Sequence, residues 1–229
     1  MTEAGYHTPV EEYLEAVYAL SEEGTAVIAA RVAERLGRSA PSVSEMLDRL
    51  EVDGLVERSG RMISLTSTGA TLAATVVRRH RLAERLLVDV IGLAWHKAHS
   101  EAGRWEHVIS TEVEAKLIEL LGDPATCPHG NAIPGSTPRP RREECPLIDF
   151  VGEGMVEILR ISEALEPDEP TMSALEGASA IPGRVVEVKW GPSGRTLEGV
   201  SGSITVSDEL AAMLFIGAEV QLNGETLLG

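Results

Sequence analysis

Hydrophobic residues at the start of the chain recur at the spacing of an amphipathic helix. Between Thr8 and Gly24 apolar residues fall at every third or fourth position, which places them on one face of a helix. Thr8, Pro9 and Glu11 match the N-cap, the first helical position and the acidic capping partner of a helix start. The pattern therefore predicts a first helix that begins at Thr8, ends at Gly24 and buries one apolar face.

The residues that follow predict a helix-turn-helix and a hairpin. Helical spacing returns over residues 27–36 and again over 40–53, with a short glycine-containing turn between the two segments. Two helices joined in this way are typical of a helix-turn-helix. Strand-like runs at 55–58 and 62–65 enclose a Ser-Gly turn and predict a β-hairpin, which would be the wing of a winged helix.

The middle of the chain is predicted to be helical and then irregular. Helical spacing covers residues 66–91, 95–108 and 111–121, so the N-terminal two-thirds should be mainly α-helical. Prolines then cluster over residues 122–150, which indicates a linker or an irregular loop.

The C-terminal part is predicted to be a small β-barrel. Short apolar runs separated by Gly and Pro indicate strands at 184–190, 200–206 and 218–222. We therefore expect four segments: a winged helix-turn-helix over 1–70, a helical domain over 71–122, a proline-rich linker over 123–150 and a β domain over 151–229.

The composition fits a globular protein with aliphatic cores. Hydrophobic residues make up 43% of the chain and aromatic residues only 3%. The chain has no apolar run long enough to cross a membrane, and its N-terminus lacks the basic start and apolar segment of a signal peptide. Its two cysteines make no disulfide framework, so we expect a cytoplasmic protein without membrane contact.

The net charge of −16 argues against a protein that coats nucleic acid without specificity. The excess acid lies mostly in the first helix and the C-terminal part, whereas acidic and basic residues balance over 25–62. DNA binding would therefore need local basic residues, together with a bound cation that offsets nearby carboxylates.

The second helix of the helix-turn-helix has the features of a DNA-reading element. Small or polar residues near its start would let the backbone approach the major groove; these are Ser39, Pro41, Ser42 and Ser44. Candidate phosphate contacts are Arg31, Arg38, Arg49 and Arg61, the last at the tip of the wing. Glu45 on this surface either accepts from a cytosine amino group or is simply solvated. The alternative is a winged helix that contacts protein instead of DNA.

Histidines and glutamates on neighbouring helices predict a metal site. His80 and Glu84 are four residues apart and share a helix face. Spacings of seven and eight residues likewise bring together His99, Glu106 and His107 on the next helix. Glu12 and Glu15 lie three residues apart on the first helix. Imidazole and carboxylate ligands together suit manganese, ferrous iron or zinc.

Simpler interpretations exist for each of these residues. Glu84 can form an intrahelical ion pair with Arg81 or Arg85, and the acidic pair of the first helix can be a solvated face. His7 and His96 are interpreted as solvated. The thiols and imidazole of Cys127, His129 and Cys145 can be read as a zinc clip, but their spacing matches no standard ligand pair, so a linker with incidental thiols is favoured.

Over about residues 8–135 the chain resembles the metal-dependent repressors of the diphtheria toxin repressor family. The resemblance rests on four short segments: Ala33-Glu34-Arg35-Leu36, Asp53-Gly54-Leu55-Val56, the run from Arg79 to Leu87, and Arg104-Trp105-Glu106-His107. It implies an N-terminal winged helix, a helical dimerisation and metal domain, and an SH3-like third domain. It also implies a homodimer that binds a pseudo-palindromic double-stranded DNA operator, and we expect dimer contacts around Leu82, Leu86, Val90 and Trp105.

The resemblance also implies two metal sites per chain. Glu106 and His107 match ligands of the primary site, while Glu12 and Gly103 stand where iron-type members carry Met and Cys. The ancillary ligands match His80, Glu84 and His99, and the third domain would add Glu166 and Glu169.

The replacement of both sulfur ligands favours Mn(II) over Fe(II). Manganese-type members carry acidic residues at the positions of Glu12 and Glu15, but they also carry a Glu where this chain has Gly103. The prediction is a metal(II)-dependent transcriptional repressor for manganese homeostasis, not an enzyme. The alternatives are an Fe(II)-dependent repressor of iron uptake, a sensor of an organic ligand, and a metallo-hydrolase with an appended winged helix.

Overall fold

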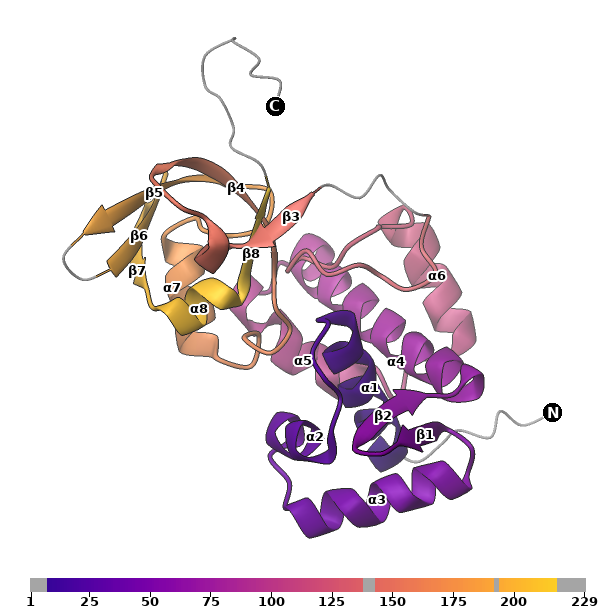
Figure 1. Ribbon diagram of the computed structural model, residues 1–229. Coiled ribbons are helices and arrows are strands. Elements are labelled where there is room, and N and C mark those ends of the chain that lie inside the picture. Colours follow the sequence, from indigo (N-terminus) through magenta and orange to yellow (C-terminus); the bar gives the residue numbers. More distant parts are fainter. Residues whose placement is uncertain (1–7, 138–142, 192–193, 218–229) are drawn as a thin grey trace.

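The computed structural model describes residues 8–137, 143–191 and 194–217. Figure 1 shows a helical lobe formed by the N-terminal part of the chain and a second lobe that contains the large sheet. In the described part of the chain, no helix combines the length and the apolar character needed to span a bilayer.

The winged helix-turn-helix is confirmed. Its helices are α1 (Thr8–Glu22), α2 (Ala29–Leu36) and α3 (Ala40–Val52), and its wing is the antiparallel pair β1 (Val56–Ser59) and β2 (Met62–Leu65). The predicted apolar faces pack into one core that includes Leu14, Val43, Leu47 and Leu50, each at most 1% exposed. The buried faces therefore match the helical spacing seen in the sequence.

The helical middle of the chain is also present. The long helix α4 (Ser67–Arg85) continues as a π-helical stretch, η1 (Leu86–Ile91), which ends at Gly92 in the left-handed conformation. After the short 3₁₀ turn η2 (Trp95–Lys97), α5 (Ala98–Trp105) and α6 (Thr111–Leu121) complete this part. Because α4 packs against α1 and α5, it connects the winged helix to the rest of the molecule (Figure 1).

The segment after α6 is irregular yet largely buried. Cys127, His129, Asn131 and Ile133 are at most 5% exposed. Arg85 of α4 donates to the carbonyl oxygens of Thr126 and Cys127, at 2.7 and 3.2 Å. This proline-containing segment therefore packs against α4 and contributes to the interior.

The C-terminal domain is an open antiparallel sheet. Its strands are β3 (Glu144–Pro146), β4 (Gly154–Ile161), β5 (Val185–Gly191), β6 (Gly194–Gly199), β7 (Gly202–Val206) and β8 (Leu214–Gly217), in the order β3-β8-β4-β5-β6-β7. The helical segments of this domain are η3 (Leu147–Asp149), α7 (Glu169–Gly177) and α8 (Asp208–Ala212).

The prediction of a closed β-barrel is wrong. The edge strands β3 and β7 do not pair with each other, so the described part of the sheet stays open. The strands predicted at 184–190 and 200–206 correspond to β5 and β7, whereas residues 218–222 lie outside the described residues. β3, β4, β6 and β8 were not predicted, and β3 lies in the segment expected to be a linker.

Candidate metal centre and DNA-binding surface

His80 lies at the centre of the candidate metal site. It comes from α4, is 3% exposed, and uses both ring nitrogens. Its Nδ1 faces Glu106 Oε2 of the α5 C-terminus, while its Nε2 lies 3.2 Å from Glu84 Oε1 and 3.0 Å from His99 Nδ1. His80 therefore joins two neighbouring groups of ligand atoms.

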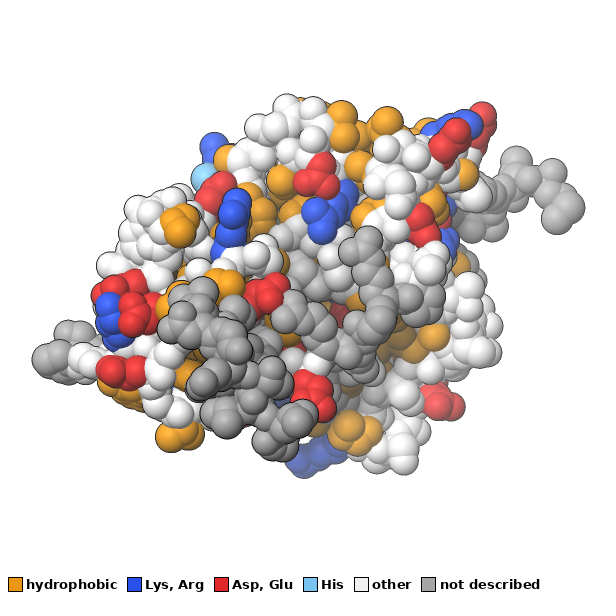
Figure 2. Space-filling model, turned by 90° about the horizontal axis from the view of Figure 1, so that it is seen from above, with side chains coloured by type: hydrophobic (Ala, Val, Ile, Leu, Met, Phe, Trp, Pro, Cys, Tyr) orange, Lys and Arg blue, Asp and Glu red, His pale blue; other side chains and the backbone are white. Residues whose placement is uncertain are grey.

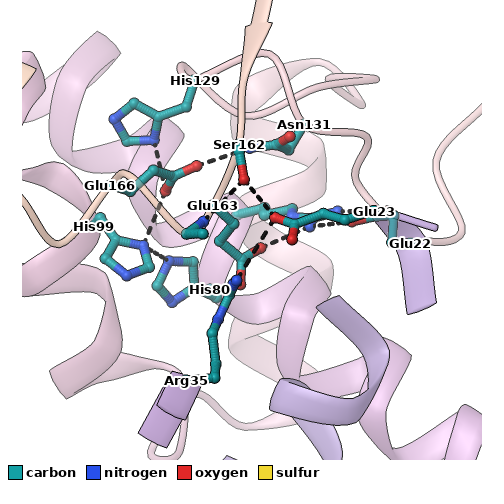
Figure 3. Close-up of polar contacts among 12 residues, drawn as sticks. Glu22, Glu23, Arg35, His80, His99, His129, Asn131, Ser162, Glu163 and Glu166 are labelled. Carbon is teal, nitrogen blue, oxygen red and sulfur yellow. Dashed lines mark hydrogen bonds and ion pairs between the residues drawn. The ribbon is translucent and has the colours of Figure 1, made fainter. Parts of the chain in front are cut away.

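The first group, called here the His99 cluster, consists of His80, Glu84, His99 and Glu166. Its candidate ligand atoms all lie within 4.8 Å of one another. Glu166 arrives from the C-terminal domain, and its Oε2 lies 2.9 Å from His99 Nδ1 (Figure 3). Glu84 Oε2 is buried without a hydrogen-bond partner among the described residues. Two facing imidazole nitrogens and an unpartnered buried carboxylate oxygen fit a divalent cation.

His129 and Cys127 adjoin this cluster and were not predicted as site residues. His129 is fully buried, and its Nδ1 lies 3.1 Å from both Glu84 Oε1 and Glu166 Oε2. Cys127, His129 and Glu84 form a candidate ligand group of their own. Cys145 is exposed on β3 and does not belong to this group. The Cys-Pro-His-Gly sequence contains two possible metal ligands, but its spacing gave no indication that Glu84 lies beside them.

The second group, called here the Glu15 cluster, consists of Glu15, His80 and Glu106. It joins α1 to α4 and the end of α5. Burial, and next the charge of Glu106, raise the pKa of Glu15 to about 8. The half-buried carboxylate of Glu15 and the buried carboxylate of Glu106 repel each other, so a positive charge between them would be favourable.

Glu11 approaches the same region, although the sequence pointed to Glu12. Glu11 Oε2 lies 2.6 Å from His107 Nδ1, and His107 Nε2 lies 3.1 Å from Glu106 Oε1. Glu12 instead lies 3.6 Å from Arg38 Nη2 and keeps 37% of its side chain exposed. Glu11 and Glu15 are four residues apart and so share one face of α1, which could have been noticed from spacing alone.

A cavity of about 180 Å³ lies beside both clusters. Its lining includes Glu12, Glu15, His80, His99, Gly103 and Glu106. A Cβ added to Gly103 would meet no atom within 4 Å, so the position opposite α1 is open space. The cavity thus brings together candidate ligands from the first helix and from the helical domain.

The third domain places Glu163, rather than Glu169, near the cavity. Glu169 is half-buried at the start of α7 and belongs to none of the ligand groups found among the described residues. Glu163 lines the cavity and binds Arg35 and Arg81. Burial acts to raise the pKa of Glu163, but Arg81 and Arg35 lower it to about 2.

Neighbouring carboxylates also hold a proton on His99. Burial acts to lower its pKa, but hydrogen bonds with Glu166 and Glu84 raise it to about 9. His96, interpreted from the sequence as solvated, is half-buried and its Nδ1 lies 2.6 Å from Glu176 Oε2 of α7. His7 lies outside the described residues.

All nine candidate DNA contacts lie on the exposed surface of the winged helix; they are Arg31, Arg38, Ser39, Pro41, Ser42, Ser44, Glu45, Arg49 and Arg61. Ser39 is the N-cap of α3, and its hydroxyl accepts from Ser42 N at 3.4 Å. A cavity of about 360 Å³ between α2, α3 and the wing is lined partly by Ser44, Arg58 and Arg61. The tip of the wing therefore stands beside the middle of α3, the predicted reading helix.

The face opposite α3 has a different character. Figure 2 views the molecule from the side away from α3. Among the side chains described there, acidic and basic groups lie in small groups of mixed sign, and no continuous basic patch is visible.

Two family models match the helical part of the chain. Residues 7–62 match the N-terminal DNA binding domain of iron dependent repressors. Residues 66–135 match the iron dependent repressor metal binding and dimerisation domain. These ranges contain the winged helix and most of the two metal-ligand clusters.

Curated relatives extend the similarity into the third domain. The chain is 40% identical over 214 residues to the iron-dependent repressor IdeR of Mycobacterium tuberculosis strain H37Rv, which covers 88% of this chain and 93% of the relative. It is 42% identical over 215 residues to the diphtheria toxin repressor of Corynebacterium glutamicum, covering 88% and 92%. Among solved structures, a manganese-dependent transcriptional repressor complex with manganese has a TM-score of 0.78 at 27% identity, covering 91% of this chain and 99% of that one.

Proposed function

The chain belongs to the iron-dependent repressor family that includes the diphtheria toxin repressor, and from this premise we propose that it is a Mn(II)-dependent repressor. Membership makes it a metal-dependent, DNA-binding transcriptional regulator and not an enzyme, which removes the hydrolase alternative. The relatives include both iron and manganese regulators, so the choice of metal rests on this chain's own residues.

The donor set of the Glu15 cluster carries the choice of manganese. The described side chains that line the cavity offer carboxylate oxygens and imidazole nitrogens but no sulfur. Hard carboxylate oxygens suit Mn(II), whereas thiolate and thioether suit softer metals. Glu12, Glu15, Glu106 and His107, with Glu11 in reach of His107, form the proposed primary site.

A second site is proposed at the His99 cluster. Its ligands would be His80, Glu84, His99 and Glu166, with His129 as a further nitrogen donor. Glu84 Oε2 is the buried oxygen that still lacks a partner there. Glu169 is not included, since it lies at the start of α7 outside the cluster.

The proposed mechanism depends on how α1 meets the helical domain. Glu15 of α1 and Glu106 at the end of α5 would hold the ion, which would supply the positive charge needed beside these carboxylates. Glu15 and Glu106 face each other across this contact, and Glu11 holds His107. Because α1 is also part of the winged-helix core, fixing α1 against α4 and α5 fixes α3 relative to the helical domain. In a homodimer this sets the spacing of two reading helices on a pseudo-palindromic operator.

DNA contacts are proposed at α3 and the wing. Ser39, Pro41, Ser42 and Ser44 would approach base edges, with Glu45 beside them. The phosphate contacts would be Arg31, Arg38, Arg49 and Arg61. The site of action would be the cytoplasm.

A metal titration of operator binding tests the proposal. Operators would be selected from a pool of random duplexes in the presence of Mn(II), and binding would be followed by fluorescence anisotropy with Mn(II), anaerobic Fe(II) and Zn(II). We expect Mn(II) to activate binding at lower concentration than Fe(II). An absence of any metal response would overturn the proposed function.

Matched variants test the reason for the metal choice. Glu12→Met should shift activation partly toward Fe(II), and Glu12→Met with Gly103→Cys should shift it further, because two sulfur donors then face the site. The open space at Gly103 accommodates the new side chain. A parent protein that responds to iron as well as the double variant does would favour the alternative, an Fe(II)-dependent repressor of iron uptake, which the 40% identity to IdeR supports.

A further inference from the structure

The outward face of α3, the predicted reading helix, carries an excess of acid. The helix has one basic residue, Arg49, and three acidic residues, Glu45, Asp48 and Glu51, and all four are exposed. DNA phosphates repel carboxylates, so a helix with this charge needs compensation before it can lie close to the DNA backbone. Arg49 alone does not offset the three carboxylates, since its Nε also lies 3.8 Å from Asp53 Oδ2.

Arg58 reaches two of these carboxylates from the wing. It lies on β1, which packs against α3 (Figure 1), and it faces the same side of the strand as the buried Val56, two residues earlier. Its Nη1 donates to Asp48 Oδ1 at 2.7 Å, and its Nε lies 3.7 Å from Glu51 Oε2. Asp48 and Glu51 are three residues apart and share one side of α3. A single guanidinium of the wing therefore faces both carboxylates.

Arg58 differs in this respect from Arg61 at the tip of the wing. Both residues line the cavity of about 360 Å³ between α2, α3 and the wing. The side chain of Arg58 is 28% exposed and is held by its two carboxylates. Arg61 is exposed and makes no hydrogen bond or ion pair with any residue that the structure describes. The charge of Arg61 is thus available to a phosphate, whereas the charge of Arg58 is already balanced within the protein.

We propose that Arg58 neutralises the acidic side of the reading helix from the wing and does not itself bind a phosphate. The offset lowers the repulsion between α3 and the DNA backbone for every base sequence, because phosphate contacts carry no sequence information. It is local, so it acts although the net charge of the chain is −16. Arg58 acts through Asp48 and Glu51 and is a positioning residue. The proposal rests on the placement of DNA at α3 and the wing proposed above.

The test measures how tightly the full-length protein binds the selected duplex with Mn(II) present, by fluorescence anisotropy at several salt concentrations. Arg58→Gln should weaken binding about two- to fivefold, which is what an exposed charge pair commonly contributes. Asp48→Asn should strengthen binding by a similar factor, because it leaves the guanidinium partly unbalanced. The double variant should return to the parent affinity and the parent salt slope. Arg58→Lys keeps the charge and should bind as the parent does.

Two further variants serve as controls. Lys189→Gln removes the same charge from the third domain, where Lys189 Nζ of β5 likewise lies near two carboxylates, 2.6 Å from Glu198 Oε2 and 3.0 Å from Glu187 Oε2. It should leave DNA affinity unchanged. Arg61→Gln should reduce the salt slope by about one, as the loss of a phosphate contact does. Adding Asp48→Asn to Arg61→Gln should not restore that slope.

The possible results separate the roles of Arg58. A salt slope that stays about one lower in the double variant of Arg58 and Asp48 would make Arg58 a phosphate ligand and overturn the proposal. Equal weakening by Lys189→Gln would also overturn it, since net charge rather than a local offset would then be responsible. If Arg58→Gln fails to fold, Asp48→Asn decides, and an unchanged affinity in that variant rejects the offset. A parent protein without Mn(II)-activated binding would instead overturn the proposed function.

Discussion

Replacing Arg81 with methionine is expected to lower the free energy of unfolding by about 3 kcal/mol at pH 7. Arg81 is 1% exposed, and its Nη2 lies 2.5 Å from Glu22 Oε2 and 2.8 Å from Glu163 Oε2. Removing one partner of a buried ion pair costs about 3–5 kcal/mol, because the other charge stays buried. Arg35 still faces Glu163 in the variant, so the lower end of this range is expected.

The pKa of Glu163 gives a second value for the free energy that this network contributes to folding. Burial acts to raise this pKa, yet Arg81 and Arg35 lower it from 4.5 to about 2. At about 1.4 kcal/mol for each pH unit, the difference corresponds to about 3 kcal/mol. Because folding lowers the pKa, this stabilisation is complete above about pH 4.5 and is lost as the pH falls toward 2.

Urea unfolding of the full-length protein, followed by circular dichroism at pH 7 and again near pH 3, measures both effects. Lys116→Met is the matched control, since its ammonium lies 2.7 Å from Glu119 but both side chains are exposed, at 74% and 72%. Such surface pairs contribute about 0–1 kcal/mol. The reasoning is refuted if Arg81→Met costs no more than Lys116→Met at pH 7, or if its cost is unchanged at pH 3.

Three other predictions concern metal binding, DNA binding and packing. Raised pKa values keep Glu15 and His99 protonated at pH 7. Mn(II) binding should therefore release about one proton per site, and its affinity should increase as the pH rises toward 9. Calorimetry in two buffers of different ionisation enthalpy should detect the released protons. A binding heat that is independent of the buffer would contradict this. Arg49→Ala and Arg61→Ala should each weaken binding to all DNA sequences and reduce the salt slope by about one, and an unchanged slope in anisotropy titrations would argue against phosphate contacts there. Gly69→Ala should cost more than about 2 kcal/mol in urea unfolding, because an added Cβ would lie 1.9 Å from Leu55 O, and a neutral result would mean that α4 shifts freely against the winged helix.

The helical part of the fold could be predicted because its cores are encoded by local spacing. Val43, Leu47 and Leu50 follow helical periodicity on α3, and all three are buried. The sheet could not be predicted to the same extent. β3 at Glu144–Pro146 pairs with β8 at Leu214–Gly217. No local sequence pattern indicates a pairing partner so far away along the chain. Whether the sheet closes or stays open depends on such pairings.

The candidate site, like the fold, could be predicted where local spacing encodes it and not where distant segments meet. His80, Glu84 and His99 could be selected because spacing on two neighbouring helices brought them together. His129 and Glu163 were missed, because each enters the site through contacts between segments far apart in the chain. Of the two third-domain glutamates named from the sequence, Glu166 belongs to the His99 cluster, whereas Glu169 belongs to none of the ligand groups found among the described residues.

Glu11 and Glu12 show that the rotation of a helix about its own axis matters as much as the presence of the helix. Neighbouring residues on a helix point about 100° apart, so Glu11 and Glu12, four and three residues before Glu15, both lie on its broad face of α1 but on opposite sides of it. Glu11 accordingly contacts His107, and Glu12 lies beside Arg38 while still lining the cavity. The rotation of α1 where it packs on α4 decides which carboxylate comes closest. The open space at Gly103 then leaves room for a carboxylate of α1, where a larger residue would have filled the gap from the opposite helix.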